Sequence, residues 1–210
     1  MTTQPGKQHD LHGSAPDNHH TALLLIDVIN DFEFPRGEEL FEAALPMAPC
    51  IANLKKRAAS VGIPAIYVND NFGRWQSRFD QIIEHCLGNV RGRPFVEQLL
   101  PNHRDYFALK PKHSAFYQTP LELLLKHFGS ERLILTGVST NSCVLFTAND
   151  AYMRDLAILV PEDCVAACDS REHTFAIEHM KCMLKADVRP SAEIDREYLA
   201  SRNAAGQPAN

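Results

Sequence analysis

Short apolar runs of strand length alternate along this chain with stretches of helical periodicity. The first run, Ala22 to Ile26, is apolar at every position, which is typical of a strand buried on both faces of a parallel sheet. We expect further strands at 64–68, 106–109, 132–136, 156–160 and near 187–189, and helices at 47–61, 120–128, 142–154 and 171–184. This alternation predicts an α/β fold, a single-domain three-layer sandwich whose mostly parallel sheet of about six strands is flanked by helices.

The composition agrees with one folded domain between two less structured ends. With 210 residues, 45% of them hydrophobic and 22% charged, the chain is long enough to bury one substantial core. We expect this domain to span residues 21–192. Residues 1–20 are polar and are expected to form a disordered leader, and residues 193–210 are expected to form a C-terminal tail.

The composition also indicates which partners the protein has and in which cell compartment it works. The net charge of -5 argues against a general surface for nucleic acid or anionic membrane. The longest apolar runs have only strand length, so no transmembrane helix is expected. The leader lacks the apolar core of a secretory signal, and the six cysteines include no CxxC pair. We therefore expect a cytoplasmic protein with reduced thiols.

Three of the expected strands lead to residues that can carry out chemistry. The first ends at Asp27, the third at Lys110, and the fourth at Gly137, shortly before Cys143. Ligands of open parallel sheets bind beyond the carboxyl ends of the strands. An acid, an amine and a thiol that are far apart in sequence could therefore meet in one crevice. Taken singly, each also has an ordinary interpretation as a turn cap, a solvated lysine or a buried thiol.

The residues around Cys143 predict that its thiol lies in the first turn of a helix. Residues 139–142 are of types that cap helices, and apolar residues follow with helical spacing. At such a position, unpaired backbone N–H groups and the helix dipole favour thiolate over thiol. We therefore expect the pKa of Cys143 to lie below the free value of about 8.5.

These motifs together resemble a known family, the isochorismatase-like cysteine hydrolases, which include nicotinamidases and N-carbamoylsarcosine amidases. The resemblance covers roughly residues 20–190 and rests on the segments 26–32, 110–119 and 137–143. It implies a Rossmann-like fold, a homo-oligomer (dimer or tetramer) and an Asp-Lys-Cys triad at Asp27, Lys110 and Cys143. The family lysine stands four residues before the serine of a Ser-Ala-Phe motif, which selects Lys110 over Lys112.

The resemblance also implies a reaction, in which the thiol attacks an amide-type carbonyl of a small-molecule substrate and a thioester forms. The oxyanion would be held by the backbone N–H groups of Ser139 and Cys143, and the peptide bond between Val138 and Ser139 would be cis. Two alternatives stay open at this point. The chain could be a catalytically idle member that serves as a binding or oligomeric scaffold, or a hydrolase of a non-amide bond.

Two positions depart from the family pattern. Nicotinamidases hold a metal through an aspartate followed two residues later by a histidine, whereas this chain has Asp70 followed by Phe72. Asp70 alone cannot hold a transition metal, so we expect no metal and no other cofactor. The family often carries glutamine two residues after the triad aspartate, and this chain has Ile29. Both changes count against nicotinamide as the substrate.

Contacts with the substrate are expected mainly from the segment 71–104, because so long an excursion inside a compact domain usually carries function. Its arginines at 74, 78, 91 and 93 could hold a substrate carboxylate, although scattered arginines are usually solvated. His113 could meet a ligand, although a surface or capping role is the more ordinary interpretation. The candidate substrate-binding residues are Asn30, Phe32, Asn71, Trp75, Phe116 and Tyr117.

Overall fold

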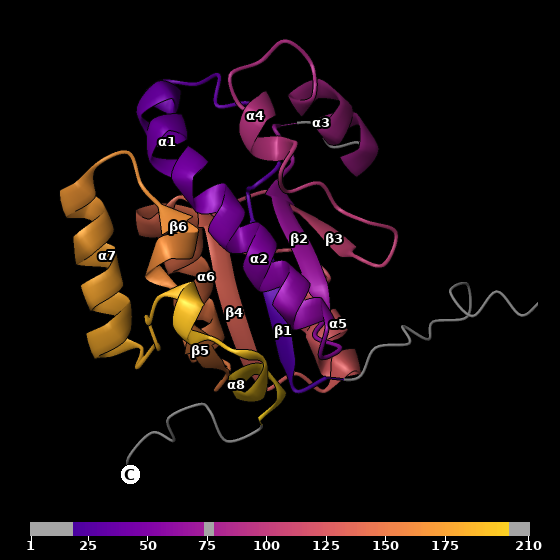
Figure 1. The fold of residues 1–210 in the computed structure, drawn as a ribbon, viewed down its shortest axis with the longest axis vertical. Helices are drawn as coiled ribbons and strands as arrows, with labels where there is room; N and C mark the ends of the chain where they lie inside the picture. Colours follow the sequence, from indigo (N-terminus) through magenta and orange to yellow (C-terminus); the bar gives the residue numbers. More distant parts are fainter. Residues whose placement is uncertain (1–18, 74–77, 202–210) are drawn as a thin grey trace, which may run out of the picture.

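The sheet is built around its central strand β1 (Thr21–Ile26). This strand pairs in parallel with β2 (Ala65–Asp70) on one side and with β4 (Arg132–Val138) on the other. Figure 1 shows the computed structural model, which describes residues 19–73 and 78–201. Most of the expected leader, residues 1–18, therefore lies outside the described residues. Among those that are described, no helix is long and apolar enough to cross a membrane.

The outer strands complete a six-stranded sheet in the order β3-β2-β1-β4-β5, with β6 also paired to β4. They are β3 (Tyr106–Lys110), β5 (Ala157–Leu159) and β6 (Val165–Ala166). All these pairings are parallel, so the carboxyl ends of the strands lie at one edge of the sheet. The predicted parallel α/β fold is confirmed.

The sixth strand is not the one that we expected. Instead of a strand near 187–189, Asp187 forms a single bridge with Leu159, and its carboxylate then accepts hydrogen bonds from the backbone and side chain of Arg189. These local bonds turn the chain away from the sheet. Because β5 pairs only with residues 132–134 of β4, the last part of β4 is left for β6, which pairs with Gly137 and Val138.

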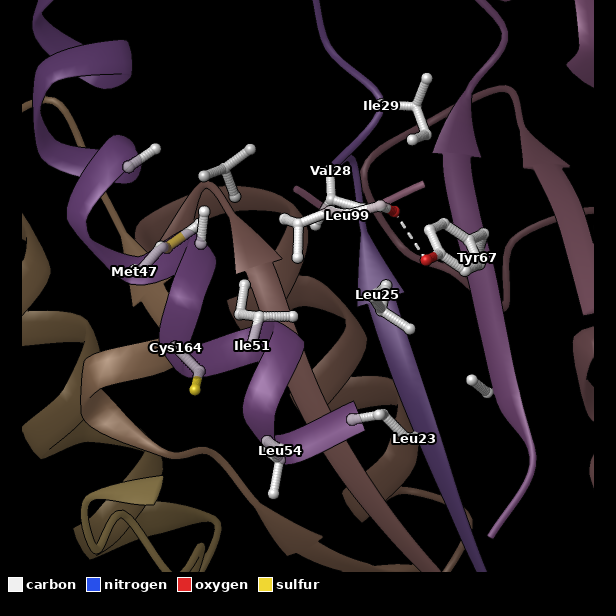
Figure 2. Close-up of a cluster of buried hydrophobic side chains, with 14 of the residues drawn as sticks. Leu23, Leu25, Val28, Ile29, Met47, Ile51, Leu54, Tyr67, Leu99 and Cys164 are labelled. Carbon is white, nitrogen blue, oxygen red and sulfur yellow. Dashed lines mark hydrogen bonds between the residues drawn. The ribbon is translucent and has the colours of Figure 1, made fainter. Parts of the chain in front are cut away.

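Alternate residues of β1 point to opposite faces of the sheet, and both faces are covered. Leu23 and Leu25 pack into the cluster of Figure 2, under α2 (Ala48–Ala59), whereas Leu24 and Ile26 pack into the cluster on the other face. The first face also carries α1 (Gly37–Ala44), the 3-10 turn η2 (Leu45–Met47) and α8 (Arg196–Ala200). The second carries α5 (Leu121–Phe128), α6 (Leu145–Tyr152) and α7 (Ser170–Met183).

The described residues of the excursion 71–104 contain two helical pieces. They are α3 (Phe79–Cys86) and α4 (Arg93–Val96), and they lie beyond the carboxyl ends of the strands (Figure 1). Phe95 of α4 is fully buried in the same cluster as α2. The excursion therefore contributes to the core as well as to the carboxyl edge of the sheet.

The chain continues to pack beyond residue 192, where we expected a tail to begin. The short turn η4 (Glu162–Cys164) follows β5 and contacts α2. The turn η5 (Ser191–Glu193) follows Asp187, also contacts α2, and is followed by α8. Ile194 and Leu199 are fully buried in the α2 cluster. Helices α1 and α8 were not predicted from the sequence.

Candidate active site

Three side chains from three strand ends meet at the carboxyl edge of the sheet. The amine of Lys110 lies 2.9 Å from Oδ2 of Asp27 and 3.4 Å from Sγ of Cys143. Lys110 is fully buried, Asp27 is nearly so and Cys143 is half-buried. The structure therefore brings the three candidate residues together, with the ammonium between the carboxylate and the sulfur.

Asp27 is positioned by the turn that ends β1. Its backbone N–H still bonds to the carbonyl of Val68, which continues the pairing with β2. Its own φ is 50°, in the left-handed region that aspartate tolerates better than most residues. The carboxylate oxygen Oδ1 accepts the N–H of Asp70 at 2.6 Å. One oxygen is thus fixed by the backbone, and Oδ2 is left to face Lys110.

Lys110 reaches Asp27 across the end of β2, which lies between β3 and β1. In the register of the sheet, Lys110 is the partner of Asp70. Its amine also donates to the carbonyl of Lys112 at 3.2 Å, and Oδ2 of Asp70 lies 3.9 Å away. Several oxygens therefore hold the buried ammonium in place, as a charge inside a protein requires.

Cys143 lies in the π-helical turn η3 (Thr140–Val144), which links β4 to α6. Such turns are rare and are often found at functional sites. The turn follows Gly137, whose φ is 113° and where a Cβ would stand 1.9 Å from the carbonyl oxygen of Ile26, so only glycine fits. The peptide bond between Val138 and Ser139 is cis.

The Ser-Ala-Phe motif ties the lysine strand to the cysteine helix. Ser114 donates a hydrogen bond to the carboxylate of Asp150 on α6. The N–H of Ala115 donates to Oγ1 of Thr147 at 3.0 Å, and that hydroxyl donates to the carbonyl of Cys143 at 2.7 Å. These bonds fix the loop after Lys110 against the turn that carries the thiol.

The charges at the site determine its protonation. Burial, followed by the negative charge of Asp27, raises the pKa of Cys143 to about 12, and Lys110 only partly opposes this effect. Our expectation of a lowered pKa was therefore wrong, because burial of the thiol, together with the nearby negative charge of Asp27, favours the neutral form. Cys143 is a thiol at neutral pH and needs a base within reach.

Asp27 and Lys110 respond to burial in opposite ways. Burial raises the pKa of Asp27 above its ordinary value, while the charge of Lys110 opposes this rise. Burial alone would lower the pKa of Lys110, but the charge of Asp27, and that of Cys143 once its thiol ionises, outweigh it and the pKa is raised. The amine therefore stays charged at neutral pH. A carboxylate with a raised pKa suits a group that takes up a proton and later returns it.

The whole domain matches a known family. The Isochorismatase domain model covers residues 21–193, which is most of the chain. The chain belongs to the isochorismatase family. It is accordingly a hydrolase, the class to which the amidohydrolase and the amidase among its relatives belong.

Three similar proteins show how far this relationship extends. YaaI of Bacillus subtilis, an uncharacterized isochorismatase family protein, is 42% identical over 173 residues, which is 82% of this chain and 95% of YaaI. Ureidoacrylate amidohydrolase RutB of an Enterobacter species is 29% identical and covers 78% of this chain and 81% of RutB. The crystal structure of N-carbamoylsarcosine amidase from Thermoplasma acidophilum superposes with a TM-score of 0.64 at 27% identity, covering 82% and 97% of the two chains.

Asn30 and Phe32, two of the candidate substrate-binding residues, shape the loop after β1. The side chain of Asn30 accepts the N–H of Phe32 at 2.9 Å. The ring of Phe32 is fully buried and packs edge-to-face on Phe95 with the ring centres 5.6 Å apart. Phe32 is therefore a core residue and not a wall of the substrate site.

The other four candidate substrate-binding residues have different environments. Asn71 is buried, and its side chain accepts the N–H of Gly73 at 3.0 Å. Phe116 is buried in the cluster under α5 and α6, so its ring also belongs to the core. Tyr117 is 53% exposed and presents its ring to solvent. Trp75 lies outside the described residues.

The arginines of the excursion are engaged within the chain, which argues against a substrate clamp. Arg74 lies outside the described residues. The other three form ion pairs, Arg78 with Asp80, Arg91 with Glu33 and Arg93 with Glu97.

Helix α3 closes a small cavity beside the loops that follow β1 and β2. The cavity has a volume of about 140 Å³ and is lined by Asp31, Phe72, Ile82 and His85. His85 of α3 lies 2.8 Å from the carboxylate of Asp31. Helix α3 thus helps to line a cavity, and two other lining residues, Asp31 and Phe72, follow Asp27 and Asp70 closely in the sequence.

The position of Phe72 also bears on metal binding. Its N–H donates to Oδ1 of Asp70 at 2.7 Å, so this carboxylate oxygen serves the turn. Within 19–73 and 78–201, no group of three or more histidine, cysteine, aspartate or glutamate side chains could hold a metal ion.

Two contacts at the site, one of the nucleophile and one of its base, were not expected from the sequence. The imidazole of His113 approaches Sγ of Cys143, with Nδ1 3.7 Å from the sulfur. The N–H of Asp70 holds the carboxylate of Asp27. The nearness of His113 to Lys110 in sequence was the only signal for the first contact, and nothing in the sequence indicated the second.

Proposed function

We propose that this protein hydrolyses an amide-type C–N bond of a small molecule through a thioester on Cys143. The observation that carries this proposal is the position of the Lys110 ammonium, within hydrogen-bonding reach of both Asp27 and Cys143. A buried carboxylate, a fixed cation and a thiol are the parts that a nucleophile with its own base requires.

In the first half of the reaction, Asp27 removes the proton from the Cys143 thiol as the sulfur attacks the substrate carbonyl. Lys110 then offsets the negative charge that develops on the sulfur. The oxyanion of the tetrahedral intermediate is held by the backbone N–H groups of Ser139 and Cys143. When the C–N bond breaks, Asp27 returns its proton to the departing nitrogen, and a thioester remains.

In the second half, water attacks the thioester carbonyl and Asp27 takes the proton from that water. The C–S bond then breaks with its electron pair on the sulfur, and Asp27 returns the proton to Cys143. The Asp27 carboxylate and the Cys143 thiol are thereby restored. No step in this sequence requires a metal ion or an organic cofactor.

The names of two relatives narrow the substrate class to be tested. One is a ureidoacrylate amidohydrolase and the other an N-carbamoylsarcosine amidase, so both names specify a nitrogen-bound carbonyl in a small molecule. We propose a ureido acid, a carbamoyl compound or a simple amide as the substrate class of this chain.

The test is ammonia release from a panel of small amides, ureido acids and carbamoyl compounds. We expect the native protein to hydrolyse at least one of these classes of compound. The Cys143→Ala variant should hydrolyse none of them. Cys182→Ala is the matched control, because Cys182 is exposed and far along the chain from the site, and it should keep full activity. Turnover by Cys143→Ala, or no turnover of the whole panel, would contradict the proposal.

A further inference from the structure

His113 stands beside the sulfur of Cys143 at a position where the proposed reaction has no assigned group. It lies on the exposed loop after β3, and its Nδ1 is 3.7 Å from Sγ of Cys143 and 3.3 Å from Oγ of Ser142. Its ring packs at a tilt on Phe146, with the ring centres 5.4 Å apart. The ring therefore has a packing partner as well as a polar contact.

We propose that His113 is a further catalytic residue, which donates an Nδ1–H hydrogen bond to the Cys143 sulfur whenever that sulfur carries negative charge. This inference rests on the proposed thioester mechanism. The sulfur would then have two donors, the ammonium of Lys110 at 3.4 Å and the imidazole of His113 at 3.7 Å.

The direction of this hydrogen bond follows from the other partners of the sulfur. In the proposed reaction the thiol proton of Cys143 passes to the carboxylate of Asp27. The sulfur can therefore only accept from a third group. A neutral imidazole carries one N–H, and the tautomer with the hydrogen on Nδ1 supplies this bond.

The bond matters most when the thioester is cleaved. As the C–S bond breaks, its electron pair moves onto the sulfur and a thiolate leaves. Lys110 is also engaged with Asp27 and with the carbonyl of Lys112. A second donor from the exposed loop stabilises the leaving thiolate without breaking the ion pair, because His113 contacts the sulfur independently of Asp27. The imidazole keeps its own proton, and Asp27 still supplies the proton that restores the thiol.

Two substitutions at this position separate hydrogen bonding from packing. His113→Phe keeps a ring of similar size for Phe146 but has no donor. His113→Asn has a smaller side chain, yet its amide nitrogen stands at the same number of bonds from Cα as Nδ1 and can donate to the sulfur. A role in packing alone would favour the phenylalanine variant, whereas the proposed hydrogen bond favours the asparagine variant.

The measurement is the rate at which iodoacetamide alkylates Cys143 at one fixed, mildly alkaline pH, with Cys182 in the same sample as the internal reference. If loss of the His113 hydrogen bond raises the pKa of Cys143 by about one unit, the thiolate fraction falls about tenfold. Since a more basic thiolate is also more nucleophilic, we expect the labelling rate of His113→Phe to fall about threefold. His113→Asn should stay close to the native rate.

The same variants are then assayed on whichever compound of the panel releases ammonia. We expect kcat of His113→Phe to fall about tenfold with little change in KM, and His113→Asn to recover most of it. Equal labelling of the native protein and His113→Phe, or an equal loss in both variants, would overturn the inference. Labelling needs no substrate, so its result stands apart from the proposed hydrolysis, which the Cys143→Ala assay tests.

Discussion

Asp27 has two opposing effects on the nucleophile beside it. Its negative charge, together with burial, raises the pKa of Cys143 to about 12 and keeps the sulfur protonated at rest. The same carboxylate is the only base of the proposed triad and is held in place by the N–H of Asp70 and by Lys110. The residue that suppresses the thiolate in the free enzyme is thus the one that produces it when a substrate is attacked.

Replacement of this carboxylate separates the two effects. In Asp27→Asn we expect turnover to fall by about 10² to 10⁴-fold, because the general base is lost. Alkylation of Cys143 should nevertheless become about threefold faster, because the charge that raises its pKa is removed while Lys110 remains. Quantitative mass spectrometry measures the labelling, with Asp31→Asn as the control on the same loop. Slower labelling in Asp27→Asn would show that the carboxylate lowers the pKa of Cys143.

Phe72 leads to a prediction about metals. Phe72 stands in place of a histidine, and within 19–73 and 78–201 Asp70 belongs to no group of three or more side chains that could hold a metal ion. One of its oxygens also accepts the N–H of Phe72. We expect activity to survive dialysis against EDTA, once elemental analysis confirms that metal has been removed. An untreated sample is the control. Activity that disappears with the metal and returns with zinc, iron or manganese would contradict this prediction.

At the scale of elements, the site is formed at the ends of strands, and the sequence alone indicated which strands these are. Apolar runs that end at Asp27 and Lys110 predict a parallel sheet, and parallel pairing places such ends at one edge. The burial of Cys143 beside the charge of Asp27, which reverses the expected pKa shift, depends on side-chain packing that no local pattern encodes. The two-residue strand β6 likewise depends on where β5 stops along β4.

The approach of β4 to β1 depends on one glycine. A Cβ on Gly137 would stand 1.9 Å from the carbonyl oxygen of Ile26, whereas one on Gly62 would meet nothing within 4 Å, although both have positive φ. We expect Gly62→Ala to cost about 1 kcal/mol through backbone strain alone and Gly137→Ala to cost more than about 3 kcal/mol. Urea denaturation measures both free energies of unfolding. If both variants lose the same free energy of unfolding, the close approach of β4 to β1 does not exclude a side chain at position 137.

At the scale of the whole molecule, the C-terminal helix closes the core on the α2 side. Leu199 of α8 is fully buried, and its carbonyl accepts a hydrogen bond from the guanidinium of Arg132 on β4. We expect Leu199→Ala to lower the free energy of unfolding by about 2 to 5 kcal/mol. Leu123→Ala, at a position that is 72% exposed on α5, should change it by less than about 0.5 kcal/mol. Chemical denaturation in urea would distinguish them, and similar values would mean that α8 adds little to the core.

The outer face of α7 gives the molecule a surface suited to self-association. Phe175 and Met183 are 70% and 62% exposed, and His179 lies between them on the same side of the helix, with its ring 6.2 Å from that of Phe175. Exposed apolar groups of this kind are common at protein interfaces. We therefore expect a dimer or tetramer in sedimentation experiments at micromolar concentration, and a single species near 23.5 kDa would contradict this. Phe175→Glu should weaken the assembly, whereas Leu123→Glu, on α5, should not. If both variants assemble like the native protein, the contact between subunits does not involve α7.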